Sequence, residues 1–142
     1  MKFYIGTDHA GFEIKDAVKS MLELRGCEVI DLGPKSNKRV DYPDFGHKVA
    51  RAVFEDVGSF GVVICGTGIG ISVAANKHKG IRAALCHDAY TASMARAHND
   101  ANILAFGQRI VGLGVIESMI DAFISTSFEG GRHASRVAKI ES

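Results

Sequence analysis

The sequence lacks a long apolar run, a surplus of charge of either sign and an even set of cysteines. No stretch approaches the ~20 consecutive apolar residues that a membrane-spanning helix needs, and Asp8 follows the start too soon for a signal peptide. The net charge is only +1, so bulk charge does not favour nucleic acid or an anionic membrane as a partner. These absences predict a cytoplasmic protein in which anion recognition comes from local clusters of basic residues.

The three cysteines, Cys27, Cys65 and Cys86, form no close pair. An odd number of separated cysteines predicts reduced thiols and no disulfide framework. Cys86 precedes His87 and Asp88, but no second pair of ligand-type residues supports a metal site there. We therefore expect no metal.

Strand-like and helix-like patterns alternate along the chain. The helix-like segments begin near residue 12, 43, 69, 88 and 113, and a last helix is expected over 133–141. Strand-like runs occupy 2–6, 27–33, 60–65, 81–86 and 102–107. Such alternation predicts a single α/β domain, 1–142, with a five-stranded parallel sheet, helices on both faces and an extra C-terminal helix.

Ligands of open parallel sheets bind at the carboxyl ends of the strands, near a reversal in strand order. Polar residues gather at four of these predicted ends. They are Thr7, Asp8 and His9, then the stretch 65–70, then His87 and Asp88, and finally Gln108 and Arg109.

The stretch CGTGIG, residues 65–70, follows the most apolar strand. It does not fit the dinucleotide pattern G-x-G-x-x-G, because Ile71 would occupy the last glycine position, and it lacks the lysine of a P-loop. Alternating glycines let successive backbone N–H groups converge on an anion, and a helix N-terminus would stabilise a thiolate at Cys65. The plainer alternative is a tight turn that only lets strand and helix pack.

Other polar residues allow two interpretations each. Asp8 could cap the first helix or contact a ligand, and His98 could complement a helix dipole or take part in catalysis. Arg132 and Arg136, four residues apart, would share one helical face with His133 as a neighbour. That face could be solvated, or it could bind a phosphate monoester.

Taken together, the stretches GTDHAG, DYPD, CGTGIGISVAANK, RAHNDANILAFGQR and FEGGRHASRVAKI resemble the type B ribose-5-phosphate isomerases over residues 5–140. Galactose-6-phosphate and allose-6-phosphate isomerases share much of this pattern. The resemblance implies a Rossmann-like three-layer α/β/α fold and a homodimer or tetramer. It also implies interconversion of ribose 5-phosphate and ribulose 5-phosphate in the non-oxidative pentose phosphate pathway, without metal or organic cofactor.

The resemblance also assigns roles to particular residues. Cys65 would be the base that moves a proton between C2 and C1, and His98 would open the furanose ring. A glutamate base used by one branch of the family is replaced here by Ile71, which places this chain in the cysteine branch. The catalytic set is then Cys65, Thr67 and His98, and the substrate-binding set is Asp8, His9, Gly66, Thr67, Gly68, Ile69, Gly70, Asn99, Arg109, Arg132 and Arg136.

The residues suit this chemistry independently of the resemblance. Aldose–ketose exchange through an enediolate needs a base at carbon, an acid at oxygen and a cradle for the oxyanion. Cys65, a histidine such as His98 and the loop amides could supply these parts. Two alternatives stay open at this point: an isomerase of hexose 6-phosphates, and a nucleotide-binding or regulatory module without catalysis.

Overall fold

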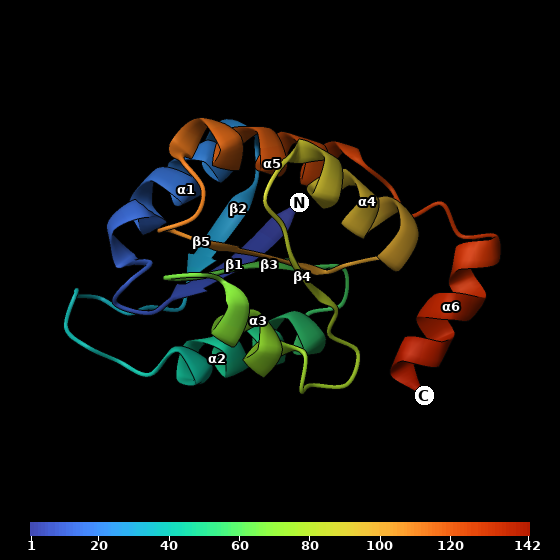
Figure 1. The fold of residues 1–142 in the computed structure, drawn as a ribbon, viewed down its shortest axis with the longest axis horizontal. Coiled ribbons are helices and arrows are strands. Elements are labelled where there is room, and N and C mark those ends of the chain that lie inside the picture. Colours follow the sequence, from blue (N-terminus) through green and yellow to red (C-terminus); the bar gives the residue numbers. More distant parts are fainter.

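The computed structural model describes all residues 1–142, and a twisted parallel sheet forms its centre (Figure 1). The strands lie in the order β2-β1-β3-β5-β4, and every neighbouring pair is parallel. Their bounds are β1 Lys2–Thr7, β2 Glu28–Asp31, β3 Phe60–Cys65, β4 Ala83–Leu85 and β5 Ile103–Gly107. The helices are α1 Phe12–Leu24, α2 Tyr42–Glu55, α3 Ile69–Ala75, α4 Ala89–Asn99, α5 Leu113–Ser125 and α6 Arg132–Glu141.

Helices cover the sheet on both faces and bury two apolar layers. In Figure 1, α1, α4 and α5 lie on one face, and α2 and α3 lie on the other. β3 has the burial expected of a central strand, because Val62 and Ile64 point into the first layer while Val63 and Cys65 point into the second. The uninterrupted apolar run of this strand therefore reflects burial on both faces.

The expected α/β architecture with five parallel strands is confirmed, whereas several element boundaries differ from expectation, most clearly those of β2, β4 and α5. The fourth strand is confined to Ala83–Leu85, since it is an edge strand that pairs only with β5. The side chain of Asn76 also bonds both backbone groups of Ala83 and so holds the turn before this strand. The fifth helix ends at Ser125, short of the expected residue 128, and the backbone N–H of Glu129 then donates to the Ala97 carbonyl at 3.0 Å.

Helix α6 stands apart from the layered body, beside the C-terminal end of α4 (Figure 1). Its C-terminal turn is tied down by Glu141, which pairs with Arg82 at 2.6 Å and accepts the Gly80 N–H at 2.8 Å. Its N-terminal turn is held by the buried ring of His133. Most of the helix between these anchors is exposed. No helix of the chain has the length and apolar character that crossing a membrane requires.

The end of β5 lies against the loop that follows β3, and Gly107 makes this approach possible. A Cβ on Gly107 would lie 2.4 Å from the Thr67 carbonyl carbon, so Gly107→Ala must push the two segments apart. We expect a loss of about 1–3 kcal/mol in the free energy of unfolding, measured by denaturant titration. The matched control is Gly114→Ala in α5, where a Cβ meets nothing within 4 Å and should stabilise by about 0.4–1 kcal/mol. Equal stability of the two variants would contradict this account.

Candidate active site

A cavity of about 470 Å³ opens at the carboxyl ends of β1 and β3, where the order of the strands reverses. Most of its walls come from residues that the sequence had indicated. The predicted residues in the walls are Asp8, His9, Cys65, Gly66, Thr67, Ile69, Gly70 and Arg109. Ala10 and Tyr42 complete the lining. The loop after β1 and the loop after β3 therefore meet in one place, as the topology of a parallel sheet predicts.

Cys65 ends β3 and lies at the wall of this cavity with only 5% of its surface exposed. Its Sγ accepts a hydrogen bond from the Gly68 N–H at 3.1 Å. Gly68 adopts a φ of +79° and packs so closely on the Phe106 backbone that a Cβ would lie 2.6 Å away. The glycine is thus required for the turn that brings a backbone donor to the sulfur.

Asp8 and His9 are held at the other wall by backbone groups. Asp8 Oδ1 accepts from the N–H groups of Ala10 at 2.9 Å and Gly11 at 3.0 Å, which shapes the turn before α1. Its other carboxylate oxygen makes no hydrogen bond within the chain. His9 Nδ1 lies 3.2 Å from both the N–H and the carbonyl of Val40, so the loop before α2 fixes this ring and leaves Nε2 without a protein partner.

Arg109 is the one arginine that lines this cavity. Its N–H donates to the Gly66 carbonyl at 3.0 Å, and its guanidinium lies against the same glycine, where a Cβ would be 3.1 Å from Nη1. The guanidinium forms no ion pair with an acidic side chain of the chain. A cation without an acidic partner beside a loop of backbone donors can bind a phosphate group.

The remaining predicted site residues lie at the opposite end of the sheet. His98 and Asn99 form the last turn of α4, which leads to the amino end of β5. Cys65 pairs with Gly107, the last residue of β5. Ile103, the first residue of β5, lies four residues before Gly107, which is about 13 Å along the strand. Within one chain, His98 therefore cannot reach a small molecule that contacts Cys65.

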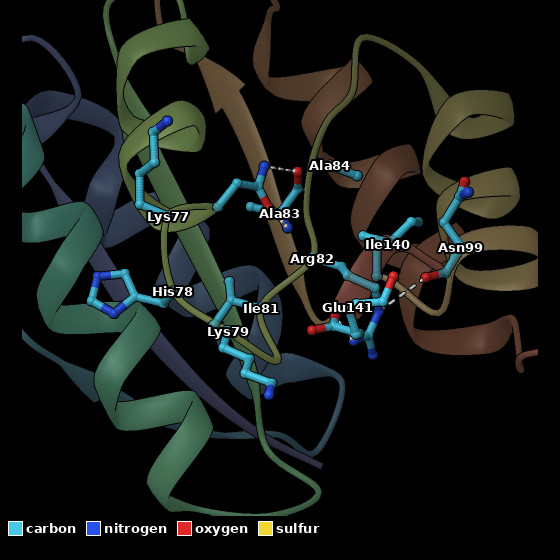
Figure 2. A pocket seen from close by; sticks show the side chains of 13 residues that line it. Lys77, His78, Lys79, Ile81, Arg82, Ala83, Ala84, Asn99, Ile140 and Glu141 are labelled. Carbon is cyan, nitrogen blue, oxygen red and sulfur yellow. Dashed lines mark hydrogen bonds and ion pairs between the residues drawn. The ribbon is translucent and has the colours of Figure 1, made fainter. Parts of the chain in front are cut away.

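A second cavity, of about 700 Å³, lies at this far end between α6 and residues 76–84. Figure 2 shows Asn99 on one side of it, Arg82 and Glu141 in the middle, and Lys77, His78 and Lys79 on the other side. Arg132 and Arg136 are exposed on α6 and form no ion pair with an acidic residue. The structure thus divides the predicted residues into two groups, at opposite ends of the molecule.

His98 takes part in a cluster that the sequence did not indicate. Its ring stacks on the ring of His133, with centroids 4.2 Å apart and planes 12° from parallel. Glu129 Oε1 lies 3.7 Å from His98 Nε2 and 3.6 Å from His133 Nε2. Burial, followed by the charges of His98 and Arg132, lowers the pKa of His133 below its ordinary value. Glu129 and His133 are four residues apart, but His98 belongs to a separate segment that meets them only in the folded chain.

The same three side chains are the one group in the chain whose donor atoms could hold a metal ion, with all donors within 4.8 Å of one another. The nitrogen lone pairs of the stacked rings lie in nearly parallel planes, so they do not meet at one point as tetrahedral ligation requires. Of Cys86, His87 and Asp88, the residues that the sequence analysis weighed as metal ligands, Asp88 caps α4: its Oδ1 accepts the Thr91 N–H at 2.7 Å.

Tyr42 is a cavity residue that the sequence analysis left unassigned. Its ring packs on Gly70, where a Cβ would lie 2.4 Å from Tyr42 Cε1. The stretch DYPD had entered only through the resemblance, and nothing in its composition shows that the tyrosine reaches the loop after β3. Gly70, the second residue of α3, therefore lets the Tyr42 ring pack against the start of this helix.

Comparison with known proteins gives a consistent result. The family model described as Ribose/Galactose Isomerase matches residues 3–140. Ribose-5-phosphate isomerase B of Escherichia coli (strain K12) is 48% identical, with 98% of this chain and 93% of that protein aligned. The structure of Clostridium thermocellum ribose-5-phosphate isomerase B superimposes with a TM-score of 0.97 at 55% identity, covering 99% of this chain and 95% of that one. The type B enzyme of Trypanosoma cruzi gives a TM-score of 0.95 at 46% identity, covering 99% and 96%.

The three cysteines should differ sharply in their reaction with iodoacetamide. Burial raises the pKa of the Cys86 thiol to about 11, so it stays protonated near pH 7, and the protonated thiol is a poor nucleophile. Cys27 and Cys65 are about equally buried, each in one of the two apolar layers, but only Cys65 lines the cavity through which a small reagent can approach. Mass spectrometry of briefly treated protein should find the modification on Cys65, and Cys65→Ala should take up no reagent in the same time. Equally fast labelling of Cys27 or Cys86 would show that the cavity does not govern access.

Proposed function

This chain belongs to the ribose/galactose isomerase family, and we propose that it interconverts ribose 5-phosphate and ribulose 5-phosphate with Cys65 as the base. The chain is an isomerase; its substrate and the roles of its residues form the proposal. The observation that carries it is the Cys65 thiol at the wall of the cavity between the loops after β1 and β3, where Sγ accepts a hydrogen bond from the Gly68 N–H at 3.1 Å and Arg109 lies close by. Cytoplasmic location, one isomerase domain over 1–142 and a place in the pentose phosphate pathway follow from this assignment.

In the proposed reaction, the thiolate of Cys65 removes the proton from C2 of the open-chain aldose and returns it to C1. The charge that develops on the sugar oxygens is stabilised by the backbone N–H groups of the loop 66–70, and the Thr67 hydroxyl lies at the same edge. Asp8 and His9 contact the sugar hydroxyls from the opposite wall. The sulfur accepts a hydrogen bond from the fixed Gly68 N–H, which holds Cys65 in place at the wall of the cavity.

Ring opening must precede this step, since ribose 5-phosphate is mainly a furanose, and we assign it to His98. Because Cys65 and His98 lie at opposite ends of one chain, the proposed site combines the Cys65 end of one subunit with the His98 end of another. Asn99, Arg132 and Arg136 would then contact the substrate from the second subunit, with the arginines and Arg109 at the phosphate. The exposed position of α6 and its unpaired arginines support this arrangement. We accordingly propose a homodimer with shared sites, and a tetramer would be a pair of such dimers.

The test is a steady-state comparison of ribose 5-phosphate, allose 6-phosphate and galactose 6-phosphate as substrates. We expect the highest kcat/KM for ribose 5-phosphate. We also expect Cys65→Ala to lower kcat by roughly 10²–10⁴-fold, the usual contribution of a positioned base. Cys27→Ala is the matched control, because it removes a thiol from the apolar layer away from the cavity, and it should keep near-normal turnover.

Three outcomes separate the alternatives. A preference for a hexose 6-phosphate would replace the substrate and leave the mechanism in place. Near-normal turnover by Cys65→Ala would show that the base lies elsewhere. No turnover of any sugar phosphate by the unmodified protein, together with binding of a nucleotide, would favour a regulatory module.

A further inference from the structure

The ring of His98 does not stand alone at the end of α4. It stacks almost face to face on His133, at 4.2 Å and 12°, and about a third of its side chain is exposed. His133 is 94% buried, and its Nε2 makes no hydrogen bond within the chain. The buried nitrogen without a partner and the exposed ring above it both face Glu129 Oε1.

The segment between α5 and α6 fixes this arrangement. The Glu129 N–H donates to the Ala97 carbonyl at 3.0 Å, which ties the carboxylate to the last turn of α4. The His133 N–H donates to the Gly130 carbonyl at 3.0 Å, so the ring lies in the first turn of α6. The stack therefore holds α6 against α4, and one of its two rings is His98, the histidine assigned to ring opening.

The surroundings of the stack oppose a proton on the buried ring of His133. Burial and the nearby positive groups of His98, Arg132 and Arg136 oppose a proton on His133, and Glu129 alone favours it. The more exposed His98 ring can be hydrated, and it faces the same carboxylate at 3.7 Å. His98 is also the ring of the pair that a substrate can reach, because His133 is buried beneath it.

We infer that Glu129 and His133 are positioning residues for His98 in the ring-opening step. His133 fixes the plane of the His98 ring by stacking, and Glu129 stabilises the imidazolium. In that step the C1–O4 bond breaks and O4 takes a proton from the imidazolium, while the anomeric hydroxyl passes its proton to water as C1 becomes a carbonyl. The neutral imidazole then regains a proton from solvent, so the numbers of protons on the sugar and on His98 are unchanged. This inference rests on the proposed function of His98.

The experiment measures two reactions of each variant. Turnover of ribose 5-phosphate requires ring opening, whereas exchange of the C1 proton of ribulose 5-phosphate in D₂O does not. We expect His133→Ala to lower ribose 5-phosphate turnover by roughly 10- to 100-fold through misorientation of His98 and to leave the exchange within about twofold. His133→Phe keeps a flat ring for stacking and should recover most of the loss.

Glu129→Gln should act on the pH profile. Loss of the carboxylate removes the charge that favours the imidazolium, so the alkaline fall in ribose 5-phosphate turnover should move to lower pH. The pH profile of the C1 exchange should not move. An unshifted profile for ribose 5-phosphate in Glu129→Gln would overturn the role of the carboxylate.

Glu141→Gln is the matched control, since it loosens the other anchor of α6 and does not touch His98. If it reproduced the selective loss, docking of α6 and not the stack would be responsible, and the inference would fail. A rise in KM for both reactions in His133→Ala would likewise indicate a merely structural role. His98→Asn distinguishes failure of the proposed function from failure of the positioning role. If His98→Asn turns over ribose 5-phosphate normally, the proposed function of His98 is wrong. If His98→Asn loses this turnover but the His133 and Glu129 variants keep it, only the positioning role is overturned.

Discussion

A parallel sheet sends the carboxyl ends of its strands and the carboxyl ends of its returning helices to opposite sides. Every strand here is followed by a helix that runs back, so the loops after β1, β3 and β5 gather at one end while α4 ends at the other. Cys65 belongs to the first set and His98 to the second. This constraint, more than any single contact, determines which of the predicted site residues one subunit can bring together, and it is the reason that the proposed site draws on a second subunit.

At the strand end, the cavity is prepared by backbone contacts and not by flexible side chains. The N–H groups of Gln108 and Arg109 donate to the carbonyls of Cys65 and Gly66, so the start of the loop after β3 is fastened to the end of β5. Gly68 and Gly107 permit approaches that a side chain would block. Donors fixed in this way need little reorganisation when charge develops on a substrate oxygen, which is the condition for effective electrostatic stabilisation.

Local patterns were enough to predict the elements, the parallel sheet and the cavity at the strand ends. The glycine spacing after an apolar strand, together with Asp8, His9 and Arg109 at neighbouring strand ends, indicated residues that do line one cavity. Their catalytic and binding roles stay predictions. The position of β4 at the edge, outside β5, was not predictable, because the order of strands depends on how the helices pack. Contacts between distant segments were missed for the same reason: Tyr42 on Gly70, and His133 under His98.

The claim that one site is built from two chains has a direct measurement. Cys65→Ala and His98→Asn chains, each inactive as a homodimer, are unfolded together in equal amounts and refolded. Random pairing makes about half of the dimers mixed, and each mixed dimer holds one site with both defects and one site with neither, as two-fold symmetry requires. The account predicts that activity recovers to roughly a quarter of that of the unmodified protein. No recovery in a sample shown by mass spectrometry to contain mixed dimers would contradict it, because both residues would then have to act from the same chain.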